Sequence, residues 1–222
     1  MRINKFLAQS SGLSRRKADS AIQAGRVTVN GQPPQPGQDI ISTDTVLLDG
    51  KRLQLAAKST IILHKPRGYV VSREGQGSKT IYELLPPEYR LLNPVGRLDK
   101  DSSGLLLLTN DGDLAQELTH PSHQKHKVYE ITLDKPLEPL HRQMISDHGI
   151  QLEDGPSKLQ LERLQEGDDT SWLVTMYEGR NRQIRRTFAA LGYNVTALHR
   201  TIFGSYELNT LASGDIRPLY SK

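Results

Sequence analysis

The chain has 222 residues, of which 36% are hydrophobic and 24% charged, and this length suits one large domain or a small domain followed by a medium one. It has no cysteine, which excludes disulfides, a thiol nucleophile, thiolate zinc sites and iron–sulfur clusters. No window approaches ~18 continuous apolar residues and the opening MRINKFLAQSSG lacks the apolar run of a signal peptide, so we expect a cytoplasmic protein with no membrane partner.

The positive charge of the chain is concentrated near its N-terminus. Residues 1–58 contain nine Lys/Arg and four Asp/Glu, whereas residues 59–222 contain 20 and 21, although the whole chain has a net charge of only +4. This asymmetry is typical of a separate anion-binding module, most often one for nucleic acid, although a solvated basic face would have the same composition. We therefore expect two domains, 1–58 and 59–222.

The first domain is predicted to begin with two short helices. Ile3, Phe6 and Leu7 give the first helix an apolar stripe. Ser14 is placed to cap the second, which Gly25 ends. Strands are predicted at residues 26–31, ending in an Asn-Gly turn, and at 45–48.

The first turn of the second helix is entirely cationic, with the sequence Arg15-Arg16-Lys17. Three positive charges oppose the helix macrodipole unless an anion lies there, and phosphate is the obvious anion. The cations expected to contact phosphate are Arg2, Lys5, Arg15, Arg16, Lys17 and Arg26.

The second domain alternates many short strands with few helices. Strands are predicted at 60–64, 69–72, 105–109, 127–133, 158–164, 172–177 and 194–199, and helices at 81–85, 113–119, 137–147 and 182–191. Because few crossover helices link the strands, we expect an α+β fold: a small N-terminal domain of helices and strands, then a mixed, largely antiparallel sheet with flanking helices.

A polar loop that leads into a leucine-rich strand is the main candidate for catalysis. The segment GRLDKDSSGLLLLTNDG spans residues 96–112, and its four consecutive leucines require burial on both faces of a sheet. The loop should therefore be held rigidly at a sheet end, where catalytic carboxylates are common. Asp99 and Asp101 could equally be turn formers or helix caps.

Two further segments combine turns with cations. HKPRGY at residues 64–69 is by itself typical of a solvated hairpin. EGRNRQIRR at 178–186 leads into a helix whose apolar stripe is Ile184, Phe188 and Leu191. Its arginines could bind RNA phosphate, an active-site carboxylate or both, or could form a solvated helix start.

These segments together resemble a known enzyme family. KPRG at 65–68, GRLDKDSSGLLLLTNDG at 96–112, KVY at 127–129 and EGRNRQIRR at 178–186 resemble, in order and spacing, the motifs of pseudouridine synthases that modify ribosomal RNA. Residues 2–31 resemble the RNA-binding module first described in ribosomal small-subunit protein four, also called the alpha-L motif. The resemblance covers nearly the whole chain and implies isomerisation of a uridine in ribosomal RNA, with small-subunit RNA favoured over large-subunit RNA.

The resemblance also implies roles for individual residues. Asp99 matches the catalytic aspartate, acting through a covalent bond to ribose or base or through a glycal intermediate. Tyr129 matches the tyrosine that stacks on the base and assists proton transfer, and Arg185 matches the arginine that pairs with the aspartate and keeps it ionised. The residues expected to bind the substrate are Lys65, Arg97, Ile184, Arg182 and Arg186, with Arg97 as the phosphate contact of a flipped-out nucleotide.

The reaction implied needs no cofactor and no metal. His120, His123 and His126 lie in HPSHQKH, but a proline interrupts the segment and no carboxylate pair is near, so a solvated loop is favoured over a metal site. We expect a monomer whose partner is ribosomal RNA or a pre-ribosomal particle.

Two other functions fit parts of the sequence. A non-catalytic ribosome-associated RNA-binding protein would share the basic module but would not need Asp99, Tyr129 and Arg185 together. A carbohydrate hydrolase could use Asp99 and Asp101 as an acid/base pair. An aromatic content of 5% gives such a hydrolase little surface for stacking on sugars.

Overall fold

The computed structural model describes residues 1–55 and 57–219. The contacts within the chain define two compact units, one built mainly from Met1–Ser59 and the other from Thr60–Thr109 and Asp113–Tyr220. Within the residues described, no helix is both long enough and apolar enough to span a membrane.

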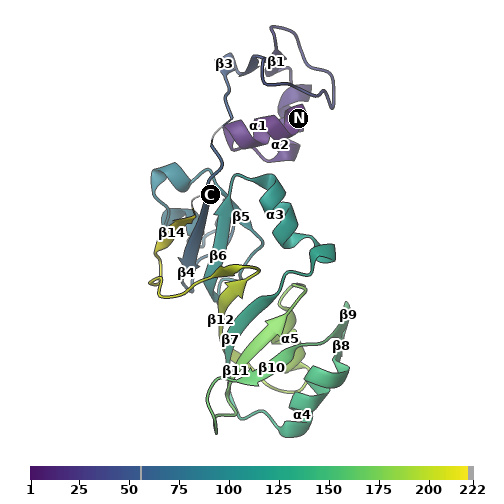
Figure 1. The fold of residues 1–222 in the computed structure, drawn as a ribbon, viewed down its shortest axis with the longest axis vertical. Helices are drawn as coiled ribbons and strands as arrows, with labels where there is room; N and C mark the ends of the chain where they lie inside the picture. The colour runs from purple at the N-terminus through teal and green to yellow at the C-terminus, as the bar shows by residue number, and fades with distance from the viewer. Residues whose placement is uncertain (56, 220–222) are drawn as a thin grey trace. The chain divides into compact units, whose positions relative to one another are not determined.

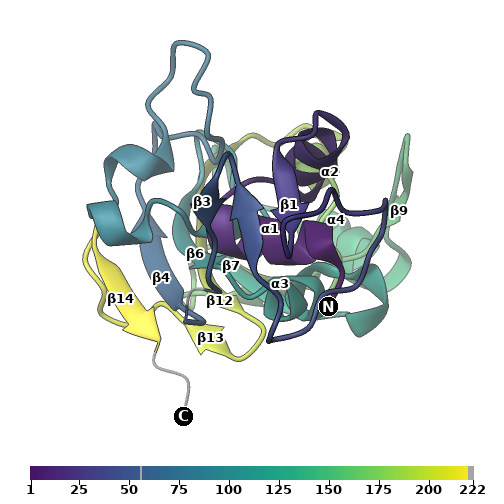
Figure 2. The same cartoon turned by 90° about the horizontal axis from the view of Figure 1, so that it is seen from above.

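The first unit packs two helices against a small sheet. Its elements are α1 (Ile3–Ser11), α2 (Arg15–Gln23), β1 (Val27–Val29), β2 (Val46–Leu48) and β3 (Lys51–Arg52). The helices and β1 lie next to one another (Figure 2), and Ile3 and Leu7 of α1 are buried as the apolar stripe predicts. Ser14 caps α2, because its side-chain oxygen accepts a hydrogen bond from the backbone N–H of Lys17 at 3.2 Å.

The second unit is built on one large, mostly antiparallel sheet. Its strands are β4 (Thr60–Lys65), β5 (Asn93–Val95), β6 (Ser103–Thr109), β7 (Lys127–Leu133), β10 (Gln160–Arg163), β11 (Ser171–Met176), β12 (Val195–Phe203), β13 (Tyr206–Glu207) and β14 (Ile216–Leu219). The main order is β10-β11-β7-β12-β6-β4-β14, as Figure 1 shows. In the described residues, the pairing of β12 with β6 is the parallel one and the others are antiparallel, which agrees with the predicted α+β class.

Short helices and a separate hairpin complete this unit. They are η1 (Ile81–Glu83), η2 (Pro87–Tyr89), α3 (Gly112–Thr119), η3 (Pro121–His123), α4 (Pro139–Gln143), the π-helical turn η4 (Met144–His148), the hairpin strands β8 (Ile150–Leu152) and β9 (Gly155–Ser157), and α5 (Gln183–Ala189).

The leucine-rich strand β6 is buried on both faces, as predicted. Leu106 and Leu108 point into the larger apolar core, with Phe188 of α5. Leu105 and Leu107 point into a second core on the other face, with Leu118 of α3. Because both faces are covered, the loop before β6 starts from a rigid support.

Two predicted elements are wrong. Residues 69–72 do not form a strand, because Val70 makes a single isolated bridge to Thr80 and the segment instead borders a cleft. Residues 81–85 form only the 3₁₀ turn η1, because Pro86 and Pro87 follow and disfavour a longer helix.

Candidate active site

Asp99 lies in the loop that joins β5 to β6, on the wall of a cleft with a volume of about 700 Å³. Its side chain is 33% exposed. The loop is held by its backbone: the Ser102 N–H donates to the carbonyl oxygen of Asp99 at 3.1 Å, and the Gly68 N–H donates to that of Lys100 at 2.8 Å. The carboxylate therefore faces the cleft from a loop whose own path is fixed by hydrogen bonds.

Lys65 lies beneath this loop and does not contact the cleft. It is completely buried, and its Nζ donates to the carbonyl oxygens of Pro66 at 3.0 Å, Asp99 at 3.1 Å and Ser102 at 2.7 Å. Burial lowers the pKa of Lys65 to about 8, while the charges of Asp99 and Asp101 oppose this shift. Lys65 was expected to bind the substrate, but it is not among the residues that line the cleft, and its ammonium donates to the Asp99 loop and to the neighbouring Pro66 carbonyl.

Gly104 allows the strand after this loop to run close to β12. Its φ is +109°, and a Cβ at this position would lie 2.2 Å from the carbonyl oxygen of Arg200. The glycine of the motif is thus required by a close approach between two parallel strands. Any larger residue would push β6, and with it the Asp99 loop, away from β12.

The ion pair with Asp99 is made by Arg182 and not by Arg185. Arg182 Nη1 lies 3.4 Å from Asp99 Oδ2, and Arg182 is the N-cap of α5 with a left-handed backbone, φ 46°. The predicted Arg185–Asp99 pair is therefore corrected: Arg185 lies on the first turn of α5, and its Nη1 donates to the carbonyl oxygen of Val195 at 2.5 Å.

Arg185 nevertheless remains in the electrostatic field of the site. Its Nη2 lies 3.5 Å from the carbonyl oxygen of Asp101. Burial and the charge of Arg182 lower its pKa, and the charges of Asp99 and Asp101 raise it. Arg182 thus forms a direct ion pair with Asp99, whereas Arg185 interacts with the Asp99 and Asp101 carboxylates electrostatically without forming an ion pair.

The cleft brings together residues from three separate sequence motifs. Asp99, Tyr129 of β7 and Arg185 of α5 all line it, although their motifs are far apart in the chain. Tyr129 and Ile184 are 7% and 5% exposed, so the cleft has an apolar and aromatic floor next to the carboxylate. Arg97 is exposed on its wall.

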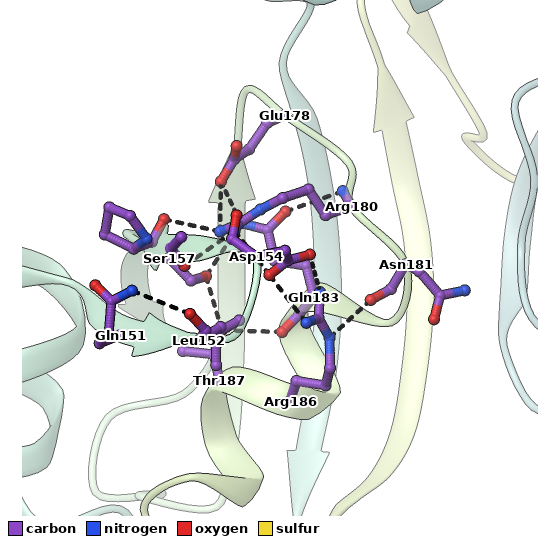
Figure 3. A network of polar contacts seen from close by, with 12 residues as sticks. Gln151, Leu152, Asp154, Ser157, Glu178, Arg180, Asn181, Gln183, Arg186 and Thr187 are labelled. Carbon is purple, nitrogen blue, oxygen red and sulfur yellow. Dashed lines mark hydrogen bonds and ion pairs between the residues drawn. The ribbon is translucent and has the colours of Figure 1, made fainter.

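A polar network that borders the cleft fixes the segment that carries these arginines. Asp154, in the turn between β8 and β9, accepts hydrogen bonds from Arg180 Nη1 at 2.9 Å and from Arg186 Nη1 and Nη2 at 2.9 and 2.7 Å (Figure 3). Ser157 of β9 accepts from Gln183 at 3.0 Å. The hairpin therefore ties both ends of the 180–186 segment.

Asp154 holds the guanidinium of Arg186, which was expected to bind substrate, in a two-point ion pair, so substrate would have to compete with this contact. Sequence reasoning missed Asp154. The signal available was the Asp154-Gly155 dipeptide between short apolar stretches, which is typical of a hairpin turn.

Two of the predicted phosphate-binding cations of the first unit already have protein partners. Arg26 donates to both carboxylate oxygens of Asp49, at 2.8 and 2.5 Å. Arg2 hydrogen bonds the carbonyl oxygen of Gly37 and lies 3.9 Å from Asp39. RNA would have to compete with these contacts.

The first turn of α2 is more open. Arg15, Arg16 and Lys17 are exposed. Arg15 has one long hydrogen bond, 3.4 Å, to the side chain of Asn4, whereas Lys5 is half-buried. The cations at the start of α2 therefore have weaker contacts with the protein than Arg2 and Arg26, and their binding of phosphate stays a prediction.

Comparisons with known proteins match this chain along almost its whole length. The family model described as RNA pseudouridylate synthase matches residues 59–190, and that of the S4 domain matches residues 1–46. The chain is 39% identical to a ribosomal small subunit pseudouridine synthase A of Pasteurella multocida, covering 99% of this chain and 96% of that protein. It is 36% identical to a ribosomal large subunit pseudouridine synthase B of Bacillus subtilis, covering 98% and 91%. A crystal structure of a pseudouridylate synthase superposes with a TM-score of 0.71 at 34% identity, over 99% of this chain and 96% of that one.

Proposed function

The chain belongs to the RNA pseudouridylate synthase family, and we propose that it isomerises specific uridines of ribosomal RNA at the cleft that contains Asp99. The observation that carries this proposal is the meeting of Asp99, Tyr129 and Arg185 on one cleft. Uridine and pseudouridine contain the same atoms, so the reaction needs no redox partner. The bond between ribose C1′ and uracil N1 breaks, the base turns, and C1′ bonds to C5. The proton on C5 then leaves, and N1, no longer bonded to ribose, takes up a proton, so the atoms balance.

The carboxylate of Asp99 is the group we assign to the bond-breaking step. A carboxylate can attack the ribose or base as a nucleophile, or can stabilise the positive charge that develops on ribose when uracil departs. The ion pair between Arg182 Nη1 and Asp99 Oδ2, 3.4 Å apart, supports this assignment because it orients the carboxylate at the cleft.

Tyr129 is assigned to the base. Its ring lies in the floor of the cleft, where an aromatic face can stack on an extruded uracil and offset part of the cost of unstacking. Its hydroxyl is the candidate for the proton transfer at C5. Ile184 is assigned an apolar contact with the base, and Arg97, exposed on the cleft wall, is assigned a phosphate contact.

The two parts of the chain are assigned separate tasks. We propose that residues 1–58 bind RNA through the cations at the start of α2, and that residues 59–222 hold the catalytic site. We further propose that the protein acts as a monomer in the cytoplasm, on ribosomal RNA or a pre-ribosomal particle, with small-subunit RNA favoured.

The alternatives fit the site less well. A carbohydrate hydrolase would need Asp99 and Asp101 to face the same sugar, but of these two only Asp99 is among the residues that line the cleft. A non-catalytic RNA-binding protein would have no need for a carboxylate, an aromatic ring and arginines grouped in one cleft.

The substitution Asp99→Asn tests the proposal. We expect single-turnover formation of pseudouridine to fall by more than about a thousandfold, because an amide cannot act as a nucleophile, while RNA affinity stays nearly unchanged. Unmodified small-subunit and large-subunit rRNA should both be tested, with the product mapped chemically because its mass equals that of uridine. Asp147→Asn is the matched control, since Asp147 is exposed on η4. Activity of Asp99→Asn within tenfold of wild type would refute the assignment.

A further inference from the structure

A second group of residues lines the same cleft beyond Tyr129. Lys127 is at the start of β7, and Arg200 and Phe203 are on β12; all three border the cleft. Both cations lie over the Phe203 ring, Lys127 Nζ at 5.1 Å and the Arg200 guanidinium carbon at 4.9 Å from its centroid. Two positive charges are thus held next to one aromatic ring.

Neither cation is neutralised by the protein. In the described part of the chain, no carboxylate comes within ion-pair distance of Lys127 or Arg200. Lys127 Nζ donates once, to the carbonyl oxygen of Lys125 at 3.1 Å, and Arg200 donates once through Nε, to that of Leu105 at 2.8 Å. Most of their donors are therefore unused by the protein.

Burial makes this arrangement costly unless an anion binds. Arg200 is only 2% exposed, and its Nη2 is buried without a hydrogen-bond partner. Burial, and in addition the charge of Arg200, lower the pKa of Lys127. Like charges in a half-enclosed site repel each other, so an anion placed between them would relieve the repulsion and satisfy the free donors.

We propose that Lys127 and Arg200 form a subsite that binds a phosphodiester of the RNA strand next to the target uridine. The proposal rests on the proposed function, because it takes the cleft to hold a uridine of an RNA chain. The Arg200 guanidinium lies 6.0 Å from the centroid of the Tyr129 ring. A phosphate held there lies beside the base that stacks on Tyr129, as the phosphates flanking one nucleotide must.

The chemistry of the subsite favours phosphate over other parts of the RNA. The bases are neutral and would leave both charges uncompensated, whereas a phosphodiester has two oxygens that can accept hydrogen bonds from an ammonium and a guanidinium at once. The position is also distinct from Arg97, which belongs to the loop on which Asp99 lies. The subsite would hold the strand beside the extruded base.

The test first uses wild-type enzyme to locate the modified uridine in unmodified rRNA, and then uses a short RNA around it. A neutral methylphosphonate replaces the phosphodiester on the 5′ side or the 3′ side of that uridine. We expect one of these RNAs to raise the half-saturating enzyme concentration of wild type about tenfold or more, because a hydrogen bond to a charged group is lost.

On RNA with normal phosphodiesters, Lys127→Met should raise the half-saturating enzyme concentration about as much as the neutral link does in wild type. The neutral link should have little further effect on this variant, because its contact with the phosphodiester is already absent. Arg200→Gln, which removes the positive charge, should behave in the same way, and a melting curve for each variant verifies folding. Lys158→Met, at an exposed position outside the cleft, is the control and should show the full wild-type sensitivity to the neutral link. The subsite would be overturned if neither methylphosphonate raised the half-saturating enzyme concentration of wild type. It would also be overturned if the increase were the same in wild type and in Lys127→Met. If wild type forms no pseudouridine in either rRNA, the proposed function fails instead.

Discussion

Replacing the buried Lys65 beneath the Asp99 loop gives the sharpest test of how the proposed site is supported. Lys65→Met keeps an unbranched apolar chain but removes the ammonium that donates to the carbonyl oxygens of Pro66, Asp99 and Ser102. Each buried acceptor left without a partner costs about 1–3 kcal/mol. The variant no longer buries a charged ammonium, and the desolvation energy that it avoids offsets part of this loss. We therefore expect a net destabilisation of about 2–4 kcal/mol at pH 7.

The destabilisation should grow with pH. Burial lowers the pKa of Lys65 from 10.5 to about 8 in the folded protein. Between these two values the unfolded chain keeps the proton that the folded chain has released, so the unfolding free energy of wild type rises with pH. Lys65→Met lacks this group, and its difference from wild type should increase by about 2 kcal/mol between pH 7 and pH 9.5.

Urea unfolding of both proteins across this pH range measures the effect, with Lys158→Met as the control for loss of an exposed lysine. The control should show no difference from wild type that changes with pH. The single-turnover rate of Lys65→Met at saturating RNA should fall as well, because the Asp99 carbonyl loses its anchor. If the difference in unfolding free energy between wild type and Lys65→Met stays constant or decreases as the pH rises, Lys65 does not titrate as a buried group and the reasoning is refuted.

Three other variants test separate parts of the structure. Arg182→Ala removes the ion pair with Asp99 and should lower the saturating single-turnover rate about tenfold or more, with a stability change below about 1 kcal/mol because the pair is partly exposed; an unchanged rate would contradict the pairing. Asp154→Asn should lower the rate at saturating RNA without altering the salt dependence of RNA affinity, because we expect the network to position the arginine segment rather than to contact RNA; a changed salt slope would argue against this role. Replacing Arg15 and Arg16 by Ala should flatten the slope of log affinity against log salt by about one to two, since each lost phosphate contact contributes roughly 0.7 to 0.9, and leave the saturating rate unchanged; an unaltered slope would mean that these cations face solvent.

Local sequence patterns were sufficient to predict the helices and strands whose burial and end residues depend on a few neighbouring residues. The four leucines 105–108 predict a strand buried on both faces, and β6 is such a strand. Ser14 predicts the start of α2 and caps it. Residues 127–133 alternate as β7 does, with the predicted bounds. Periodicity and capping act over a few residues, so they can be read without knowing the fold.

The sequence also identified the residues that meet at the cleft, but only through their resemblance to a family. Asp99, Tyr129 and Arg185 lie in separate motifs, and nothing in their spacing places them on one wall. The order of strands β7, β12 and β6 in the sheet brings these motifs together. That order depends on pairings between residues far apart in the chain.

Only the tertiary structure decided which charged groups pair. The left-handed backbone of Arg182 and the first turn of α5 determine that Arg182 reaches Asp99 while Arg185 reaches the Val195 carbonyl. The hairpin that carries Asp154 determines that Arg186 forms an ion pair with this carboxylate. The sequence shows that four arginines lie between residues 180 and 186. Each guanidinium binds an acceptor that packing brings near it, and those acceptors come from segments distant in the chain. Local sequence preferences cannot predict where such distant segments lie.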